Sequence, residues 1–493
     1  MENGDSNTPS PHSRSRSTAA TRHACEAKIP IRFYALTALF ALMIFAGNRR
    51  HFREQGIFRR QVLLAQSVLA GDGYQYPRDQ WPGNAETGPA FFPVWGYPLF
   101  CLPGVWLGHT AKYVLVAQYL LSMVGLFYFY KTFDLKERFW HIPLLWPYFI
   151  MASVKWADAV ACILVLPYIY YTHQHLVHGR RRHLFLSGIL LGLMATFRSE
   201  YLVLVAFQLA VVLLPHVRQF RRRYLVLIGS QFLLTLAVLS PWAIRAYLVS
   251  SHIYFTGANG GMVSYISLGQ LPDNPWHIKH SDAEAFAYTH ARGERNTVGP
   301  EGDRMLKQEF RRLVLAHPGA YARKVWHNLK RALNKGVYMG DACSPYESPE
   351  RESRVQAVAE EHGWRVAIQK TMTARETADL LFWRTLVRLY SIIKPMWLVL
   401  LLMFVAAGFM LARKPQSLLF AIILGLVIHK IAIVSLLQHQ PRHMNPIWMP
   451  VLGFALLGLR HGFLAARSRF SSTRNTSTCA PSEALPEPRG AGL

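Results

Sequence analysis

The chain has 493 residues, of which 51% are hydrophobic and only 17% are charged. A soluble protein carries about 25% charged residues, so this composition argues against a wholly soluble chain and favours one embedded in lipid. The net charge of +26 would suit a nucleic-acid binder, but the basic residues stand in short blocks between apolar runs, as the positive-inside rule produces. We therefore expect no nucleic-acid partner and a protein that handles anionic lipids.

The N-terminal part begins with a polar tail and continues into a first membrane anchor. Residues 1–28 are rich in Ser, Thr, Pro, Arg and His, which is typical of disorder. The apolar run from Ile31 to Ala46 has no small-residue cleavage site after it, so we interpret it as an anchor rather than a signal peptide. A first outer loop follows over 48–95, with a short amphipathic helix expected over 54–70. The Gly and Pro residues at the end of this loop exclude a regular helix there.

Apolar segments then recur at membrane-spanning length. They lie near 97–130, 140–153, 157–174, 184–198, 201–217 and 224–243, and again near 389–412, 417–436 and 447–463. Because 97–130 is too long for one ordinary span, it holds either a re-entrant piece or a second helix. The pattern predicts an all-α polytopic membrane protein with about ten spans, within a range of roughly nine to twelve.

The segments and the long polar stretch between them divide the chain. We separate a tail (1–28), an N-terminal membrane module (29–249), an outer region (250–385), C-terminal membrane helices (386–465) and a second disordered tail (466–493). Placing the N-terminal tail in the cytoplasm and alternating sides puts every short basic cluster on the cytoplasmic face. Both termini are then cytoplasmic, and the loop 48–95 and the region 250–385 lie outside.

One acidic residue stands out in the first outer loop. Asp72 lies in Ala70-Gly71-Asp72-Gly73-Tyr74, just before the Pro-rich run. Flanking glycines let the backbone approach a ligand closely, and an Asp in such a loop can act as a general base toward a hydroxyl. The alternative is an Asp in a tight turn, because Asp-Gly is a common turn pair. Local sequence by itself favours the turn.

Cationic side chains recur at the predicted outer ends of the membrane helices. Four separate outer links carry them: Lys155 with Asp158, Arg198 with Glu200, Arg245 alone, and Arg442 with His443. Such a cation can hold a phosphate at the headgroup level, whereas for any one of them interfacial anchoring is the alternative. Four together, two with acids beside them, favour an anionic ligand. The five cysteines and the histidines near 173–183 lack the spacing of a metal site.

The order of several short motifs resembles the GT-C superfamily of membrane glycosyltransferases, in particular the bacterial branch related to protein mannosyltransferases and lipid A aminoarabinose transferases. The first loop has an early acid and a Pro-rich run ending in Gly96-Tyr97-Pro98. FRSE at 197–200 is similar to the family's Phe-Arg-Pro-Glu. SPWAIRAY at 240–247 with ANGG at 258–261 is similar to its Pro-Trp-x-x-Arg-Asn-Tyr with a later Asn-Gly-Gly. PRHMNP at 441–446 resembles its late Arg-Tyr-x-x-Pro, and 309–328 its amphipathic helix with a His-Pro break.

The resemblance implies an enzyme in a bacterial inner (plasma) membrane that moves a sugar from a polyprenyl-phosphate donor to an acceptor hydroxyl on the extracytoplasmic face, with inversion. The acceptor is a glycan, a lipid or a protein. Asp72 matches the general base. The donor phosphate would be held by Arg442 and Arg245, and in second place by Arg198 and Lys155. Further candidates for the site are Asp158, Glu200, Glu86, His443, Tyr97 and Asn259.

The chain departs from the family's pattern at several positions. His443 stands where the family usually has Tyr, Ser199 replaces Pro, and Ala246 replaces Asn. The family's first loop often carries two acids close together, and here the next acids after Asp72 are Asp79 and Glu86. No cofactor is implied with certainty. Nothing in the sequence forms a metal site, but metal dependence varies across the superfamily, so a divalent cation stays open.

Two other functions fit a multi-span protein with outer arginines. A polysaccharide polymerase or ligase usually has its large loop late in the chain and needs no early Asp, so the first loop argues against it. A transporter or flippase shows inverted repeats and charges within its spans. No mirrored halves are visible in this sequence, and its charges are expected at the borders of the spans.

Overall fold

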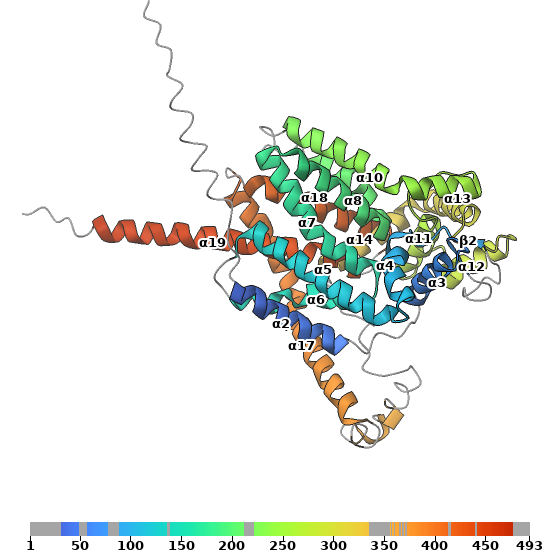
Figure 1. The fold of residues 1–493 in the computed structure, drawn as a ribbon, viewed down its shortest axis with the longest axis horizontal. Helices are drawn as coiled ribbons and strands as arrows, with labels where there is room; N and C mark the ends of the chain where they lie inside the picture. Colours follow the sequence, from blue (N-terminus) through green and yellow to red (C-terminus); the bar gives the residue numbers. More distant parts are fainter. Residues whose placement is uncertain are drawn as a thin grey trace, which may run out of the picture.

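The computed structural model describes residues 31–48, 57–76, 88–135, 139–211, 221–334, 372–412, 416–438 and 441–476, with a few positions between 355 and 369. Over these residues the chain is mostly helical, and the β structure is one pair of two-residue antiparallel strands, β1 (Gln75–Tyr76) and β2 (Gly88–Pro89). Figure 1 shows the helices gathered into an elongated bundle.

The membrane-type helices follow the predicted apolar segments in order, with two corrections to the predicted bounds. The helices are α2 (Ile31–Asn48), α4 (Gly96–Trp106), α5 (Thr110–Phe133), α6 (Trp146–Ser153), α7 (Ala157–His178), α8 (Arg181–Phe197), α9 (Leu204–Val211), α10 (Arg221–Ser250), α17 (Ala374–Met410), α18 (Gln416–Leu436) and α19 (Asn445–Thr476). Helix α17 begins at Ala374, inside the predicted outer region, and α19 continues to Thr476, into the tail predicted to be disordered. The 3-10 turns η3 (Phe139–Leu145), η4 (Ser199–Val203) and η8 (Pro441–Met444) lead into α6, α9 and α19. The long segment 97–130 holds two helices, because Gly108 turns the chain at a φ of 68° between α4 and α5.

Among the residues that the structure describes, four helices are long and apolar enough to cross a membrane: α5, α10, α18 and Asn445–Ala466 within α19. Helices of this kind are typical of a membrane-embedded protein. Others are shorter than the ~20 residues that an ordinary span needs, with 8 residues in α6 and 17 in α8. The count of about ten spans therefore stays a prediction.

The centre of the bundle is packed around α7 and α8. Helix α8 lies against both α7 and α10, and α17 lies against α19. Close approach of α8 to α10 depends on glycine, since a Cβ on Gly188 would lie 2.5 Å from Leu234 and one on Gly192 would lie 2.7 Å from Val238. The outer faces of the bundle expose large apolar side chains, as Leu233 and Leu248 of α10 do, which suits contact with lipid.

The first loop and the outer region share a second hydrophobic core. The amphipathic helix expected over 54–70 is confirmed as α3 (Ile57–Leu69), and the outer helices are α11 (Gly260–Ser267), η6 (Leu268–Gln270), α12 (Asp282–His290), α13 (Pro300–Ala316) and α14 (Pro318–Asn334). Tyr74 of the first loop packs in one cluster with Trp242, Tyr265 and Leu306. The expected His-Pro break is confirmed, because His317 ends α13 and Pro318 begins α14.

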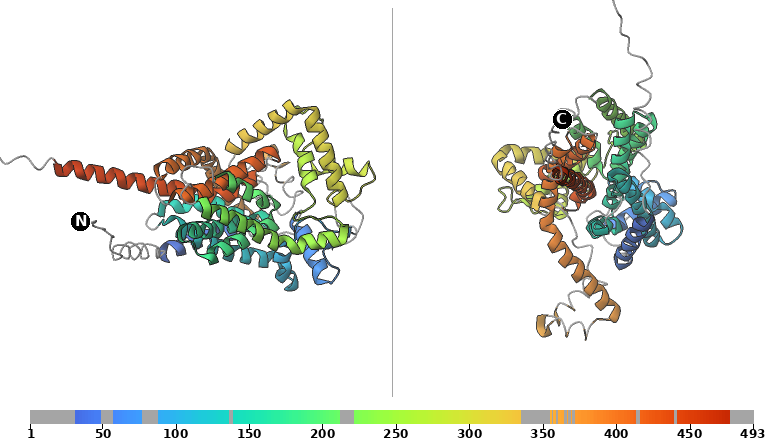
Figure 2. Two further views of the ribbon diagram at one scale, coloured as in Figure 1. Left: turned by 90° about the horizontal axis from the view of Figure 1, so that it is seen from above. Right: turned by 90° about the vertical axis from the view of Figure 1, so that its left-hand side faces the viewer.

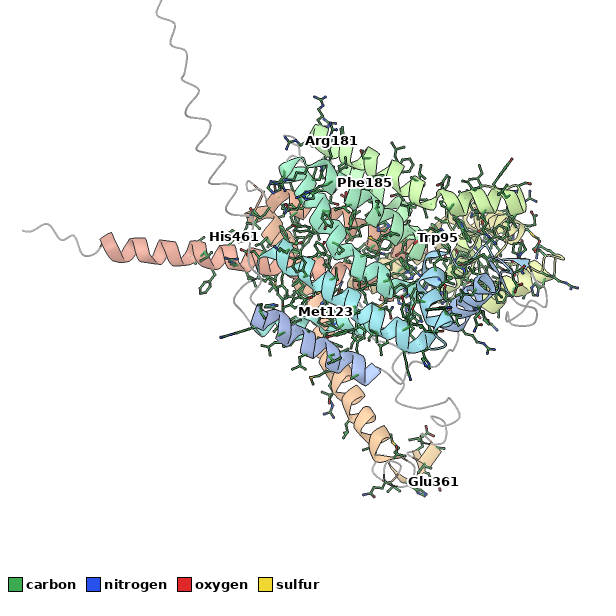
Figure 3. The ribbon with its side chains drawn as sticks, in the orientation of Figure 1. Trp95, Met123, Arg181, Phe185, Glu361 and His461 are labelled. Carbon is green, nitrogen blue, oxygen red and sulfur yellow. The ribbon has the colours of Figure 1, made fainter. Side chains whose placement is uncertain are left out.

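The outer helices gather at one end of the bundle. Figures 1 and 2 show α3, α11, α12 and α13 at the end opposite the projecting part of α19. In Figure 3, Trp95 lies toward the end that holds α3 and α12, whereas Arg181 and His461 lie toward the end from which α19 projects. This arrangement agrees with the predicted separation of the first loop and outer region from the basic clusters, and the sidedness itself stays a prediction.

The packing of α8 on α10 yields a test of the bundle. Gly192→Val places a branched side chain where even a Cβ would come within 2.7 Å of Val238. We expect a fall of about 1–3 kcal/mol in the free energy of unfolding, as overpacking usually causes. Gly229→Val in α10 is the matched control, since a Cβ there meets nothing within 4 Å. Thermal unfolding in detergent, followed by tryptophan fluorescence, measures both, and equal losses would contradict the close contact.

Candidate functional site

The first loop holds Asp72 in a tight turn at the end of α3. Gly71 and Gly73 on either side have φ values of 85° and 78°, a left-handed conformation that favours glycine. The Asp72 amide donates to the Ser67 carbonyl at 3.0 Å, and the Ser67 hydroxyl donates to the Gly73 carbonyl at 2.9 Å. The Asp72 side chain itself is exposed. The turn expected from local sequence is therefore present, and it leaves the carboxylate accessible.

The two limbs of the first loop are tied together beyond this turn. β1 pairs with β2, and the Ala90 amide donates to the Tyr74 carbonyl at 3.0 Å. The hydroxyls of Tyr74 and Tyr76 donate at 2.7 Å to the carbonyls of Pro93 and Phe92. Glu86, the second acid considered, lies outside the described residues.

Arg245 binds the first loop. Its guanidinium donates to the Tyr74 carbonyl at 2.6 Å and to the Ala90 carbonyl at 3.0 Å, and it lies 5.2 Å from the centre of the Tyr74 ring. The structure therefore gives this arginine backbone partners in the loop, a contact that the sequence did not suggest.

The segment around Asn259 also meets the first loop. The Ala258 amide donates to the Phe91 carbonyl at 3.0 Å. Asn259 is half-buried and precedes α11 without capping it through its side chain. The amide of Gly261, two residues after Asn259, donates to the buried carboxylate of Asp303 at 2.6 Å. The Asn-Gly-Gly element thus serves as a backbone junction between the first loop, α11 and α13.

Charged residues from four parts of the chain meet in one ionic cluster, which we define as Asp158, Arg198, Glu200, Lys430 and His443. Arg198 Nε lies 3.1 Å from Asp158 Oδ1, and its Nη2 lies 3.3 Å from Glu200 Oε2. Arg198 Nη2 donates to Nε2 of His443 at 2.5 Å, which requires that nitrogen to be unprotonated. Lys430 Nζ pairs with Glu200 Oε1.

Local structure explains why these side chains converge. Asp158 lies in the first turn of α7, where a negative charge is favourable near the helix N-terminus. Arg198 ends α8 in an extended conformation, which lets the chain turn into η4 with Glu200. The neighbouring His429 donates to the Glu200 carbonyl at 2.9 Å. Three of the four predicted outer links therefore lie close together, since His443 follows Arg442 directly.

Burial ranks the members of the ionic cluster. The Lys430 side chain is 1% exposed and the Arg198 side chain 23%. Two cations face two carboxylates, and with a neutral His443 the cluster carries no net charge. Burying a charge is tolerated only when it is paired in this way. Of these two cations, Arg198 therefore keeps part of its side chain exposed, whereas Lys430 is fully buried.

Lys430 and His429 were not among the residues singled out from sequence. They lie within α18, six and seven residues from its end at Leu436, in the most apolar of the predicted segments. The expectation that charges lie at the borders of the spans and not within them is wrong for this helix. A lysine inside a membrane segment is itself a pattern that indicates function or pairing, and the HK pair at 429–430 could have been found on that ground.

The first loop reaches the ionic cluster through Gly96. A Cβ on Gly96 would lie 2.3 Å from the Thr196 hydroxyl, two residues before Arg198. Tyr97 is 1% exposed and packs with Phe58 and Val160 in an apolar cluster. It therefore belongs to the packing beneath the site, out of contact with solvent.

The remaining two predicted cations are Lys155 and Arg442. Lys155 is buried and its ammonium lies 4.6 Å from the centre of the Phe58 ring, at the start of α3. Asp72 follows the other end of α3, so roughly 20 Å of helix separates it from Lys155. The backbone of Arg442 lies in η8, and its side chain is outside the described residues.

The outer region caps the helix that carries Lys430. Lys324 of α14 is buried, and its ammonium donates to the carbonyls of Leu436 and Leu437 at the end of α18. A cation is favourable at that helix end, although burial lowers the pKa of Lys324 to about 7. The Tyr321 hydroxyl donates to the same Leu436 carbonyl at 2.8 Å. The position of α18 is thus coupled to the outer region.

Pairing within the ionic cluster can be tested by stability. Lys430→Met leaves the buried Glu200 with one cation in place of two, so we expect the free energy of unfolding to fall by about 3 kcal/mol. Adding Glu200→Gln should recover part of this loss, because the uncompensated carboxylate is then gone. Thermal unfolding in detergent measures both variants.

An exposed pair provides the control for that measurement. Arg460→Gln breaks the contact between Arg460 and Asp134, whose two side chains are 46% and 41% exposed, respectively. It should change the free energy of unfolding by less than about 1 kcal/mol. A Lys430→Met variant that is no less stable than Arg460→Gln would contradict the role given to the buried pair.

Comparisons with protein-family models, with curated proteins and with solved structures find no match to this chain.

Proposed function

We propose that this protein is a membrane glycosyltransferase of the GT-C type, with about ten spans, that moves a sugar from a polyprenyl-phosphate donor to an acceptor hydroxyl on the extracytoplasmic face. The observation that carries the proposal is the convergence of Asp158, Arg198, Glu200 and His443 from separate outer links. Side chains from such distant positions are gathered at a buried point at a cost, and charged groups of this kind usually mark function.

The chemistry requires a base and a site for the leaving phosphate. As the acceptor oxygen bonds to the anomeric carbon, the Asp72 carboxylate takes the hydroxyl proton. The bond from that carbon to the phosphate oxygen breaks, and the electron pair leaves with the polyprenyl phosphate, so the configuration inverts. Cations placed near that oxygen stabilise the charge that develops there. We assign this role to Arg198, whose side chain is partly exposed, and to Arg442 beside His443.

The course of the first loop supports the proposal. Tyr74, two residues after Asp72, donates to the Pro93 carbonyl. Three residues further, Gly96 packs directly against Thr196 at the end of α8, next to Arg198. The first loop thus runs from the Asp72 turn to a contact two residues before Arg198, which supports one site for donor and acceptor.

The proposed base is tested by Asp72→Asn. The amide keeps the shape of the turn but cannot take a proton, so transfer should fall by at least about 10²–10⁴-fold, with expression and membrane insertion unchanged. The assay follows label from a panel of radiolabelled polyprenyl-phosphate sugars into membrane extracts, with wild type and variant side by side.

The matched control for the base is Asp273→Asn. Asp273, like Asp72, is an exposed aspartate in a loop, and its loss should leave transfer intact. Turnover retained in Asp72→Asn would remove Asp72 as the base. If the wild type transfers none of the labelled sugars, the proposed transfer from these donors is wrong.

The proposed phosphate contact is tested by Arg442→Ala. A charge-assisted hydrogen bond is worth about 1.5–3 kcal/mol, so the KM for the donor should rise roughly tenfold to a hundredfold, with the KM for the acceptor little changed. Arg460→Ala, in the middle of α19, is the control. An equal rise for both substrates would count against a phosphate role.

A second candidate function, movement of a lipid-linked sugar across the membrane, is favoured by one observation. Lys430 and His429 are fully buried within α18, and charges inside spans are typical of transporters. Reconstituted vesicles separate the two functions. A transporter moves the labelled lipid to the opposite leaflet without cleaving its sugar, whereas a transferase releases polyprenyl phosphate.

A further inference from the structure

Arg245, the last residue of the PWAIR segment of α10 (residues 241–245), contacts the backbone of the first loop. Arg245 donates to the Tyr74 carbonyl at 2.6 Å and to the Ala90 carbonyl at 3.0 Å, one partner on each limb of the loop. The guanidinium also lies 5.2 Å from the ring centres of Tyr74 and Trp242, and 5.8 Å from that of Phe91. Arginine suits this position because its planar group donates in two directions while its faces pack on aromatic rings.

The ANGG segment reinforces the same attachment. Trp242 Nε1 donates to the Thr256 carbonyl at 3.2 Å, which draws the segment against α10. Two residues later the Ala258 amide donates to the Phe91 carbonyl at 3.0 Å. A Cβ on Gly257 would lie 3.1 Å from the Phe92 ring, so glycine allows this close approach. Arg245 and the backbone of residues 256–258 therefore both hold the first loop.

The amide that follows in this segment is already engaged. Gly261 N donates to Asp303 Oδ1 at 2.6 Å, and Asp303 is buried and paired with Lys307 at 2.5 Å. A carboxylate thus occupies the start of α11, the place where an anionic ligand would otherwise bind to a helix N-terminus. The contacts of Arg245 and of Gly261 both point to a structural junction.

We propose that Arg245 is a positioning residue for Asp72 and not a ligand of the donor phosphate. It holds the carbonyl of Tyr74, two residues after Asp72, and locks that limb to Ala90 of the returning limb. This inference rests on the proposed function, in which Asp72 is the base.

The first loop needs such a support because its own structure is slight. β1 and β2 have two residues each, and an isolated pair of strands is marginal in water. Ser67 of α3 anchors the Asp72 turn on both sides of Asp72. The two limbs beyond it are joined by the ladder, by the Tyr74 and Tyr76 hydroxyls and by Arg245. A base displaced by about 1 Å can lose on the order of 10²-fold in rate, so rigidity here matters for catalysis.

The test compares Arg245→Gln and Arg245→Lys with Arg292→Gln. Lysine keeps the positive charge but lacks the planar fork that reaches both limbs. Arg292 is the matched control, since it also donates to a carbonyl and lies over a ring, both of Tyr288, within the outer region. We expect kcat to fall by roughly 10–100-fold in both Arg245 variants, with the KM for the donor within about twofold of wild type and Arg292→Gln unchanged. A raised donor KM with kcat preserved, or full activity in Arg245→Lys, would overturn the proposal.

A combined variant asks whether Arg245 acts through Asp72. In the Asp72→Asn background, Arg245→Gln should cause no further loss of transfer, because the group that it positions is already inactive. A further loss of the same size as in the wild-type background would overturn the proposal, since Arg245 would then act on something else.

A readout independent of activity separates this inference from the proposed function. Amide hydrogen exchange of the detergent-solubilised protein should be faster over residues 70–76 and 88–91 in Arg245→Gln than in wild type, with α7 and α8 unchanged. Unchanged exchange over the first loop would overturn the positioning role even if transfer is observed. Faster exchange with no transfer by the wild type would leave Arg245 as the support of the loop and remove the proposed function instead.

Discussion

The outer end of this bundle depends on one constraint, that a charge buried away from water must be neutralised where it is buried. Glu200 meets this constraint by dividing its two carboxylate oxygens between Arg198 and Lys430. Arg198 in turn reaches Asp158 of α7 and His443 of η8. The pairing therefore ties α7, α8, η4, α18 and η8 to one another at a single point, which apolar packing between helices would not specify so narrowly.

Two elements attach to this point from outside and transmit their positions to it. The first loop arrives through Gly96, whose lack of a side chain allows contact with Thr196. Helix α14 arrives through Lys324, which binds the last carbonyls of α18. The first loop is held again at its far end by Arg245. The first loop, between α2 and α4, and the outer region, after α10, are therefore both coupled to the ionic cluster. The proposed base and the proposed phosphate site thus belong to one connected framework.

Much of the helical architecture could be predicted from the sequence, whereas the pairing could be predicted only in part. Apolar runs, the amphipathic pattern of α3 and the His317-Pro318 break are local, and each appears where it was expected. Asp158, Arg198, Glu200 and His443 were found because charged residues beside apolar runs are conspicuous. Lys430 was missed because averaging over an apolar run hides a single lysine. The partners of Arg245 and the burial of Tyr97 depend on contacts between segments far apart in the chain, which no local pattern reports.

The division of Glu200 also bears on how Arg198 can meet a ligand. A carboxylate that gives both oxygens to one guanidinium forms a bidentate pair, which occupies a whole edge of that group. In this structure Glu200 does not form such a pair, because Lys430 takes one of its oxygens. Asp158 does give both oxygens to Arg198, since Oδ1 lies 3.1 Å from Nε and Oδ2 accepts from Nη1 at 3.4 Å. The cluster is neutral, and each guanidinium nitrogen of Arg198 already contacts Asp158, Glu200 or His443. A bound phosphate would therefore share these N–H groups or displace one of the partners, with no net charge to attract it. Such an arrangement favours binding at a defined place over strong binding, and a leaving phosphate must also be released.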